Sequence, residues 1–205
     1  MKRIYTAESV TSGHPDKLAD LIADSILDEC LSQDSESRVA CEVMLSYDKC
    51  ILAGEITTKA KVDYIEIAKE VIKNVGYDET SIEYELRIHK QSTDINNAVS
   101  KNEQGAGDQG IVYGYAIKET DSFMPLPITL ANRIIRRLEE VRRKNIIEGL
   151  LPDGKSQVSI EYDDEKIIGI KSIIISAQHK KSKNVIELKQ EIKNLIIDYV
   201  FEDYD

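Results

Sequence analysis

The chain has 205 residues, of which 41% are hydrophobic and 31% are charged, and it carries a formal net charge of −10 at pH 7. This composition is typical of a globular protein with one large or two small domains, and the negative charge argues against nucleic acid as a partner. The three cysteines lack metal-ligand spacing, and no apolar run resembles a signal peptide or a membrane span, so we expect reduced thiols, no membrane partner and a cytoplasmic location.

Apolar periodicity predicts alternating strands and helices along the first half of the chain. In chain order we expect a strand over 3–10, a helix over 15–31, strands over 38–45 and 49–58 around the turn SYDK, a helix over 62–77 and a strand over 81–91. Gly76 is the expected left-handed residue that ends the second helix.

The second half is predicted to follow the same order after the polar stretch 92–109. The expected elements are a strand over 111–119, a helix over 128–146, a hairpin of strands over 156–164 and 165–178, and a helix over 185–200. Because helix, hairpin and helix occur twice, we predict an α/β fold of the α+β type. It has two similar layers of mixed or antiparallel sheet, each with helices packed on one face.

This order predicts a division of the chain into three parts. The parts are an N-terminal domain over 1–97, a loop and glycine-rich segment over 98–109, and a second domain over 110–205, with residues 1–12 as a candidate to pack with the second domain. The string GAGDQG at 105–110 matches a dinucleotide-binding fingerprint in letters only. That fingerprint needs a strand before it and a helix after it, and here a polar run precedes it and a strand is expected to follow.

Several polar residues stand where the local pattern does not expect them. His14 precedes a proline at the first position of a helix, where Ser, Thr, Asp or Asn is the usual N-cap. Asp16, in the first turn, could simply complement the helix dipole, and Lys155 could be a turn lysine. Glu42 and Glu55 each interrupt an apolar strand, which indicates either a solvent-facing position or a bound cation.

Six short strings, taken together, resemble one family. They are ESVTSGHPDK, RVACE, GEITT, KQSTDI, QGAGDQG and DGKSQV, and in this order and spacing they resemble S-adenosylmethionine synthetase, also called methionine adenosyltransferase. The resemblance runs from the N-terminus to about residue 179. That family joins ATP to L-methionine: the methionine sulfur attacks the ribose C5′ and displaces the triphosphate, which is split into pyrophosphate and phosphate.

The resemblance implies a role for each matched residue. His14 would lie against the triphosphate, with its ring turned to the ligand rather than capping the helix, and with Lys155 it would be catalytic. The other implied roles are a Mg²⁺ ligand (Asp16), a K⁺ ligand (Glu42), ATP contacts (Asp153, Gly154 and Lys155) and methionine contacts (Glu55, Gln91 and Asp108).

The chain also departs from the family pattern. Thr93 stands where the family usually has proline, the gate segment 95–103 is short, and the strings that mark the family's C-terminal domain are absent. Two classes therefore stay open: part of the synthetase, or a non-catalytic module that keeps the fold and a nucleotide-binding or dimer surface. The resemblance implies a homodimer, a dimer of dimers, or pairing with the missing C-terminal half. We expect the 205 residues alone to be inactive.

Overall fold

A computed structural model of the chain describes residues 1–90 and 109–202. The chain forms two compact units, one made of residues 1–17 with 115–205 and the other of residues 18–114. We refer to them as the terminal unit and the inner unit. Most of the segment predicted as a gate loop, 98–109, lies outside the described residues.

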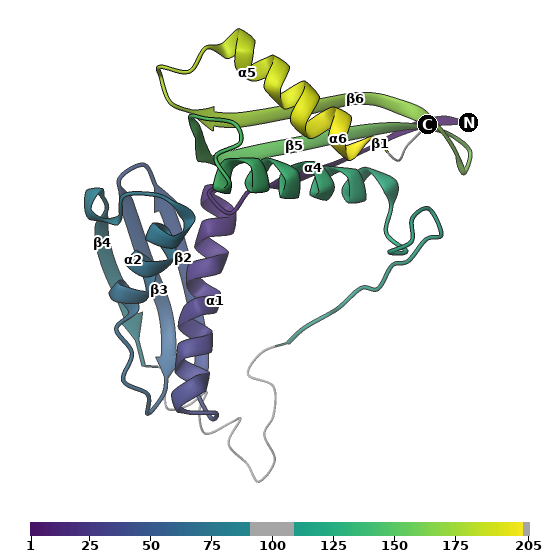
Figure 1. The fold of residues 1–205 in the computed structure, drawn as a ribbon. Coiled ribbons are helices and arrows are strands. Elements are labelled where there is room, and N and C mark those ends of the chain that lie inside the picture. Colours follow the sequence, from purple (N-terminus) through teal and green to yellow (C-terminus); the bar gives the residue numbers. More distant parts are fainter. Residues whose placement is uncertain (91–108, 203–205) are drawn as a thin grey trace. The chain divides into compact units, whose positions relative to one another are not determined.

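The terminal unit contains an antiparallel sheet in the order β1–β5–β6 (Figure 1). Its strands are β1 (Lys2–Val10), β5 (Leu150–Asp163) and β6 (Lys166–His179). The helical segments of this unit are α4 (Leu126–Arg143), α5 (Val185–Ile192), the π-helical turn η2 (Lys193–Ile197) and α6 (Asp198–Val200). Alternate β5 residues are buried with α4, α5 and η2 in one core, which includes Val158, Ile160, Ile134, Leu138, Leu188 and Ile196.

The inner unit contains a mixed sheet in the order β2–β3–β4, in which β2 is antiparallel and β4 parallel to β3. Its elements are β2 (Arg38–Ser46), β3 (Lys49–Thr57), β4 (Glu83–His89), α2 (Tyr64–Val75), the short 3₁₀ turn η1 (Glu79–Ser81) and most of α1 (Pro15–Gln33). Both helices bury their apolar stripes on one face of the sheet, in a core that includes Ile22, Ile26, Leu52, Ile56 and Ile72. The predicted α+β fold class is confirmed.

Two local turn predictions in the inner unit are also confirmed. Gly76 ends α2 with φ 111°, and its N–H donates to the carbonyls of Ile72 and Lys73. A left-handed residue at this position satisfies helix carbonyls that have no other intrahelical donor. Between β2 and β3 the chain turns through Tyr47 and Asp48, as the string SYDK predicts.

The predicted strand over 111–119 is wrong. The structure has no strand there, and Ile111, Val112 and Tyr113 are 78%, 96% and 88% exposed. Alternating apolar residues indicate that a segment can form a strand, but a strand needs a partner edge to hydrogen-bond with. Among the described residues, no strand pairs with this segment.

The start of β5 is also earlier than predicted. The strand was expected from residue 156, with a turn as one interpretation of Lys155, whereas β5 already includes PDGK and pairs Gly154 with Ala177 and Lys155 with Ser176. The turn tendency of these residues is therefore overridden by the pairing of β5 with β1 on one side and β6 on the other. The register between β5 and β6 is irregular between Leu150 and Gly154. Residues Asp153–Lys155 are consequently held by a sheet and not by a loop.

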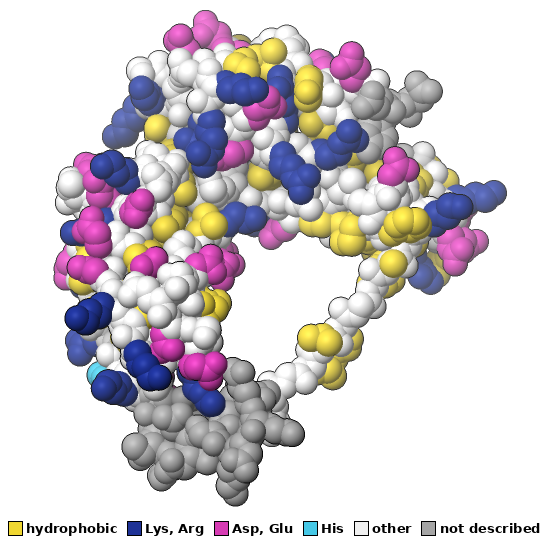
Figure 2. Space-filling view, turned by 60° about the horizontal axis from the view of Figure 1, so that its bottom comes forward, with side chains coloured by type: hydrophobic (Ala, Val, Ile, Leu, Met, Phe, Trp, Pro, Cys, Tyr) yellow, Lys and Arg dark blue, Asp and Glu magenta, His cyan; other side chains and the backbone are white. Residues whose placement is uncertain are grey.

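The surface carries both kinds of charge. On the face that Figure 2 shows, Lys and Arg side chains gather over the upper part of the view with fewer Asp and Glu side chains between them, whereas both signs are mixed over the lower left part. No helix in the described part of the chain is both long and apolar enough to cross a membrane.

The cysteines of the inner unit provide a test of its packing. Cys50 is 0% exposed, and burial, followed by the nearby Cys41, raises the pKa of its thiol to about 11 from 9.0. A rise of two units in the pKa lowers the fraction of Cys50 present as thiolate about a hundredfold, and the thiolate is the reactive form. We expect iodoacetamide at pH 8 to modify Cys50 at least ~100-fold more slowly in the native chain than in urea, as measured by peptide mass spectrometry. Equal rates would contradict the buried position.

Candidate active site

Two segments that are far apart in the sequence interlock in the terminal unit. The turn that leads into α1 lies against the start of β5, where the Thr11 N–H donates to the Gly154 carbonyl at 2.9 Å. The Thr11 hydroxyl, which is 2% exposed, donates to the Pro152 carbonyl at 2.7 Å. The His14 N–H donates back to the Thr11 carbonyl at 3.1 Å and closes the turn. The strings SGHPDK and DGK are thereby held side by side.

Two glycines allow this close approach. A Cβ on Gly13 would lie 2.4 Å from the Pro152 carbonyl carbon and 2.5 Å from its oxygen. A Cβ on Gly154 would lie 2.8 Å from Leu138 Cδ2 and 3.3 Å from the Ser176 carbonyl oxygen. Real Cβ atoms do not lie as close to backbone as 2.4–2.5 Å, so the contact with Pro152 requires glycine at position 13, whereas at position 154 the end of the Leu138 side chain would have to shift.

The expectation that His14 does not cap α1 is wrong. Its Nδ1 accepts a hydrogen bond from the Asp16 backbone N–H at 3.3 Å, which is the contact that an N-cap side chain makes. The ring can cap because Nδ1 is positioned like the oxygen of an Asn side chain. A neutral ring that accepts at Nδ1 carries its proton on Nε2 and can donate from there. Capping and donation to a ligand are therefore compatible.

Asp16 presents its carboxylate to solvent at the N-terminus of α1. Its side chain is 89% exposed, and one of its oxygens lies 3.8 Å from His14 Nδ1. Groups of three or more His, Cys, Asp or Glu side chains that could hold a metal do not occur among the described residues. Mg²⁺ in nucleotide sites, however, is commonly held by one or two carboxylates together with substrate phosphates and water. Asp16 fits that kind of site.

Lys155 points to the sheet face opposite α4. Its neighbours on β5 face α4, since the Ser156 hydroxyl is buried and donates to the Ala131 carbonyl at 2.8 Å. Because successive strand residues alternate between faces, Lys155 lies on the other face. There its Nζ is 2.9 Å from a carboxylate oxygen of Glu8, and both side chains are about half exposed, at 42% and 54%.

Glu8 is a site residue that sequence reasoning missed. The register between β1 and β5 pairs Val10 with Lys155 and Glu8 with Gln157, so Glu8 and Lys155 are diagonal neighbours on one face. Only the register between β1 and β5 identifies Glu8 as a neighbour of Lys155, and this register cannot be read from the sequence of either strand alone. The carboxylate neutralises part of the lysine charge and orients its ammonium group.

Asp153 is exposed enough to contact a ligand, and its position is set by its backbone. The Asp153 N–H donates to the side-chain oxygen of Gln178 at 3.2 Å. The three predicted ATP contacts Asp153, Gly154 and Lys155 are therefore aligned along β5. Of the predicted site residues, the terminal unit brings together His14 and Asp16 with these three.

Glu42 and Glu55 belong to the inner unit and share the sheet face that α1 and α2 do not cover. Glu42 pairs with Ala53 and Glu55 pairs with Ala40, so the two residues are diagonal neighbours on adjacent strands, and the backbones of such a pair are typically about 7–8 Å apart. Both residues are exposed. Two nearby like charges favour a cation or an ammonium group between them. A potassium ion there needs further oxygen ligands, because the described residues supply no third acidic, His or Cys ligand.

The remaining predicted methionine contacts, Gln91 and Asp108, lie outside the described residues. Their positions relative to Glu55 therefore stay a prediction.

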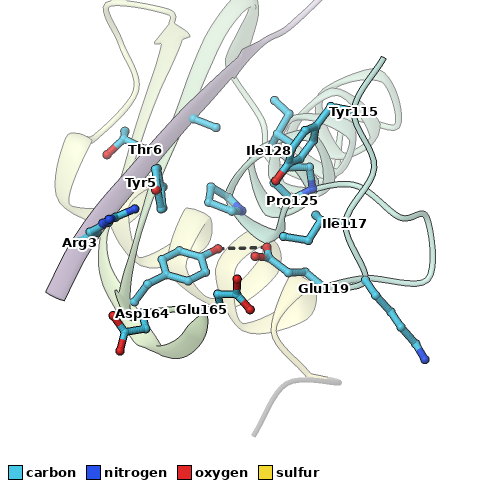
Figure 3. A pocket seen from close by; sticks show the side chains of 14 residues that line it. Arg3, Tyr5, Thr6, Tyr115, Ile117, Glu119, Pro125, Ile128, Asp164 and Glu165 are labelled. Atoms are coloured by element: carbon cyan, nitrogen blue, oxygen red, sulfur yellow. Dashed lines mark hydrogen bonds between the residues drawn. The ribbon is translucent and has the colours of Figure 1, made fainter. Parts of the chain in front are cut away.

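A cavity of about 820 Å³ lies elsewhere in the terminal unit, and Figure 3 shows its lining. None of the predicted site residues lines it. The carboxylate of Glu119 accepts hydrogen bonds from the Tyr162 hydroxyl at 3.1 Å and from the Leu126 N–H at the start of α4 at 2.8 Å. Burial, and then Glu119, raises the pKa of Tyr162. These polar groups are used within the fold, so this cavity is not the candidate site.

The fold and the interlocked turn define an α+β protein in which a helix N-terminus and a lysine-bearing strand are held together. Family profiles place it more narrowly: the S-adenosylmethionine synthetase N-terminal domain matches residues 2–103, and the central domain of the same family matches residues 103–205. The chain therefore belongs to the S-adenosylmethionine synthetase family.

Individual relatives agree with this assignment. The S-adenosylmethionine synthase of Prochlorococcus marinus (strain MIT 9515) is 46% identical over 212 residues, covering 95% of this chain and 51% of that protein. The S-adenosylmethionine synthases of Sulfurovum sp. (strain NBC37-1) and Brachyspira hyodysenteriae are 44% and 42% identical and cover 98% and 96% of this chain. The chain spans about half the length of the curated relatives it matches.

Proposed function

We propose that the chain carries the triphosphate-facing part of a methionine adenosyltransferase site. The complete site makes S-adenosylmethionine from ATP and L-methionine and releases phosphate and pyrophosphate. The observation that carries the proposal is the interlock between the SGHPDK turn and the DGK strand in one unit. It places the residues that the family resemblance assigns to the triphosphate on two segments joined by direct hydrogen bonds.

The chemistry of these residues suits a polyphosphate leaving group. The N-terminus of α1 offers backbone N–H groups and a positive dipole end, which favour an anion. His14, with its Nδ1 engaged by Asp16, can donate from Nε2 to an oxygen on which charge develops. Lys155, oriented by Glu8, adds a positive charge. Asp16 would hold Mg²⁺, which supplies further positive charge to the phosphate oxygens when it is bound.

The residues that the family resemblance assigns to methionine and K⁺ belong to the inner unit. Glu55 would pair with the methionine ammonium group, Gln91 and Asp108 would complete the contacts, and Glu42 would hold K⁺. The exposed like charges of Glu42 and Glu55 on one sheet face support this assignment. We place the protein in the cytoplasm as a homo-oligomer, or as a chain that pairs with the C-terminal half that its relatives contain.

Asp16 provides the direct test of the proposed nucleotide site. In the 205-residue chain, Asp16→Asn is expected to weaken MgATP binding about tenfold, because the amide keeps the shape but loses the negative charge that attracts Mg²⁺. Calorimetric titrations with and without Mg²⁺ measure the effect. The matched control is Asp20→Asn, which removes the same charge one turn further along α1 and is expected to leave binding unchanged.

The same titrations separate the proposal from its alternative, a non-catalytic module that keeps the fold. Identical Mg²⁺-dependent curves for the native chain and Asp16→Asn would contradict the assigned role of Asp16. If neither protein binds nucleotide while both are folded by circular dichroism, the alternative of a non-catalytic module that keeps the fold and a dimer surface is supported.

A further inference from the structure

The turn that carries His14 is held from a second side by α4. The Ser12 hydroxyl donates to Glu139 Oε1 at 2.9 Å. The same oxygen accepts from Arg142 at 2.7 Å and from Arg143 at 2.6 Å. Ser12 is thus joined through one carboxylate to two arginines of the following helical turn. Thr11 is bound to β5, so the two residues attach the turn to different elements.

Glu139 and Arg142, at the centre of this network, are shielded from solvent, whereas the Arg143 side chain is 51% exposed. The side chains of Glu139 and Arg142 are 18% and 13% exposed. Burial alone would raise the pKa of the Glu139 carboxyl, but hydrogen bonds from Arg142, Ser12 and Arg143 hold it below its ordinary value. Glu139 is therefore ionised at neutral pH, and its charge keeps the three donors on one oxygen.

Stability alone does not explain such a network. Glu139 Oε2 and Arg142 Nε are buried and have no hydrogen-bond partner within the described residues. Partly satisfied buried ion pairs contribute little net stability, and apolar replacements of similar volume are often neutral or better. A carboxylate whose donors converge on one oxygen does, however, define where Ser12 lies. Ser12 is separated from His14 by Gly13 alone, and the Gly13 backbone lies so close to Pro152 that an added Cβ would come within 2.5 Å of its carbonyl oxygen.

We propose that Glu139, acting through Ser12, is a positioning residue that holds the His14 turn and the N-terminus of α1 in place for an anionic ligand. This rests on the proposed function of the same site. The arginines orient the carboxylate, the carboxylate orients Ser12, and Ser12 limits movement of the Thr11–His14 turn. In this proposal Glu139 acts through Ser12 and not by contact with the ligand.

The test uses the 205-residue chain and two measurements. Amide hydrogen exchange follows the His14 and Asp16 N–H groups, whose acceptors are the Thr11 carbonyl and His14 Nδ1. Calorimetry with magnesium tripolyphosphate follows anion binding. Ser12→Ala and Glu139→Ala are each expected to speed exchange at both amides at least ~10-fold and to weaken tripolyphosphate binding ~3- to 10-fold, because the turn opens locally.

Two controls separate positioning from general destabilisation. Glu140→Ala removes the same charge from α4, but Glu140 contacts Arg137 and Lys144 and not the turn. Glu140→Ala is expected to change neither the amide exchange of His14 and Asp16 nor the binding of magnesium tripolyphosphate. Ser12→Thr keeps a hydroxyl and is expected to restore slow exchange. Exchange at Val158 and Ile160 reports the β5 core and is expected to stay the same in every variant.

The outcomes discriminate between the two proposals. Unchanged His14 and Asp16 exchange in Ser12→Ala would overturn the positioning role, as would an equal effect from Glu140→Ala. If the native chain does not bind magnesium tripolyphosphate, the proposed function fails, and the exchange rates still decide whether Glu139 holds the turn.

Discussion

Incubated with ATP, L-methionine, Mg²⁺ and K⁺, these 205 residues alone are expected to form S-adenosylmethionine far more slowly than the roughly 1 s⁻¹ that enzymes typically reach. Charge stabilisation along the whole triphosphate is usually the largest catalytic contribution, and removing one donor costs about 100- to 1,000-fold in rate. In the proposed site His14 and Lys155 would cover part of that charge, and Glu8 forms an ion pair with Lys155. The chain spans about half the length of the relatives it matches, and we expect the remaining donors of the complete site in the other half.

The assay measures S-adenosylmethionine and pyrophosphate by chromatography, with the Prochlorococcus marinus S-adenosylmethionine synthase as the positive control. The loss of two such donors corresponds to a deficit of at least about 10⁴-fold, and we expect at least that much here. Turnover by the 205 residues near 1 s⁻¹ would show that they contain every group the reaction needs, and it would overturn this division of roles.

Replacing Gly13 by alanine is expected to both destabilise the terminal unit and abolish tight binding of magnesium tripolyphosphate. The added Cβ would meet Pro152 carbonyl atoms at 2.4 and 2.5 Å, so either the His14 turn or the start of β5 has to move. Overpacking of this kind costs about 1–3 kcal/mol. At about 2–4 °C per kcal/mol, the melting temperature is expected to fall by about 2–12 °C.

Gly169→Ala is the matched control in the same unit, because a Cβ there meets nothing within 4 Å. It is expected to change stability by less than about 0.5 kcal/mol and to leave binding intact. Thermal unfolding by circular dichroism and calorimetric titration provide the two readings. If Gly13→Ala matches Gly169→Ala in both thermal unfolding and titration, the backbone contact between the turn and Pro152 is needed neither for stability nor for binding.

The sequence by itself determined the features that depend on neighbouring residues. Helical spacing located the apolar stripes of α1 and α2, Gly76 marked the end of α2, and SYDK marked the hairpin turn. Each of these signals is local, because helix periodicity, a left-handed cap and a two-residue turn act over a few residues. The order of the elements then gave the α+β class, since each amphipathic helix needs a sheet face to cover.

The features that depend on distant segments were decided only by the tertiary structure. PDGK has the composition of a turn, yet pairing with β1 and β6 makes it part of β5. The segment 111–119 has the alternation of a strand, yet it has no pairing edge among the described residues. The same reason applies to the candidate site. His14, Asp16 and Lys155 could be proposed from the sequence strings that contain them. The contact of Glu8 with Lys155 depends on the register between two strands, and the contact of Glu139 with Ser12 depends on the packing of α4. No local sequence pattern encodes either contact.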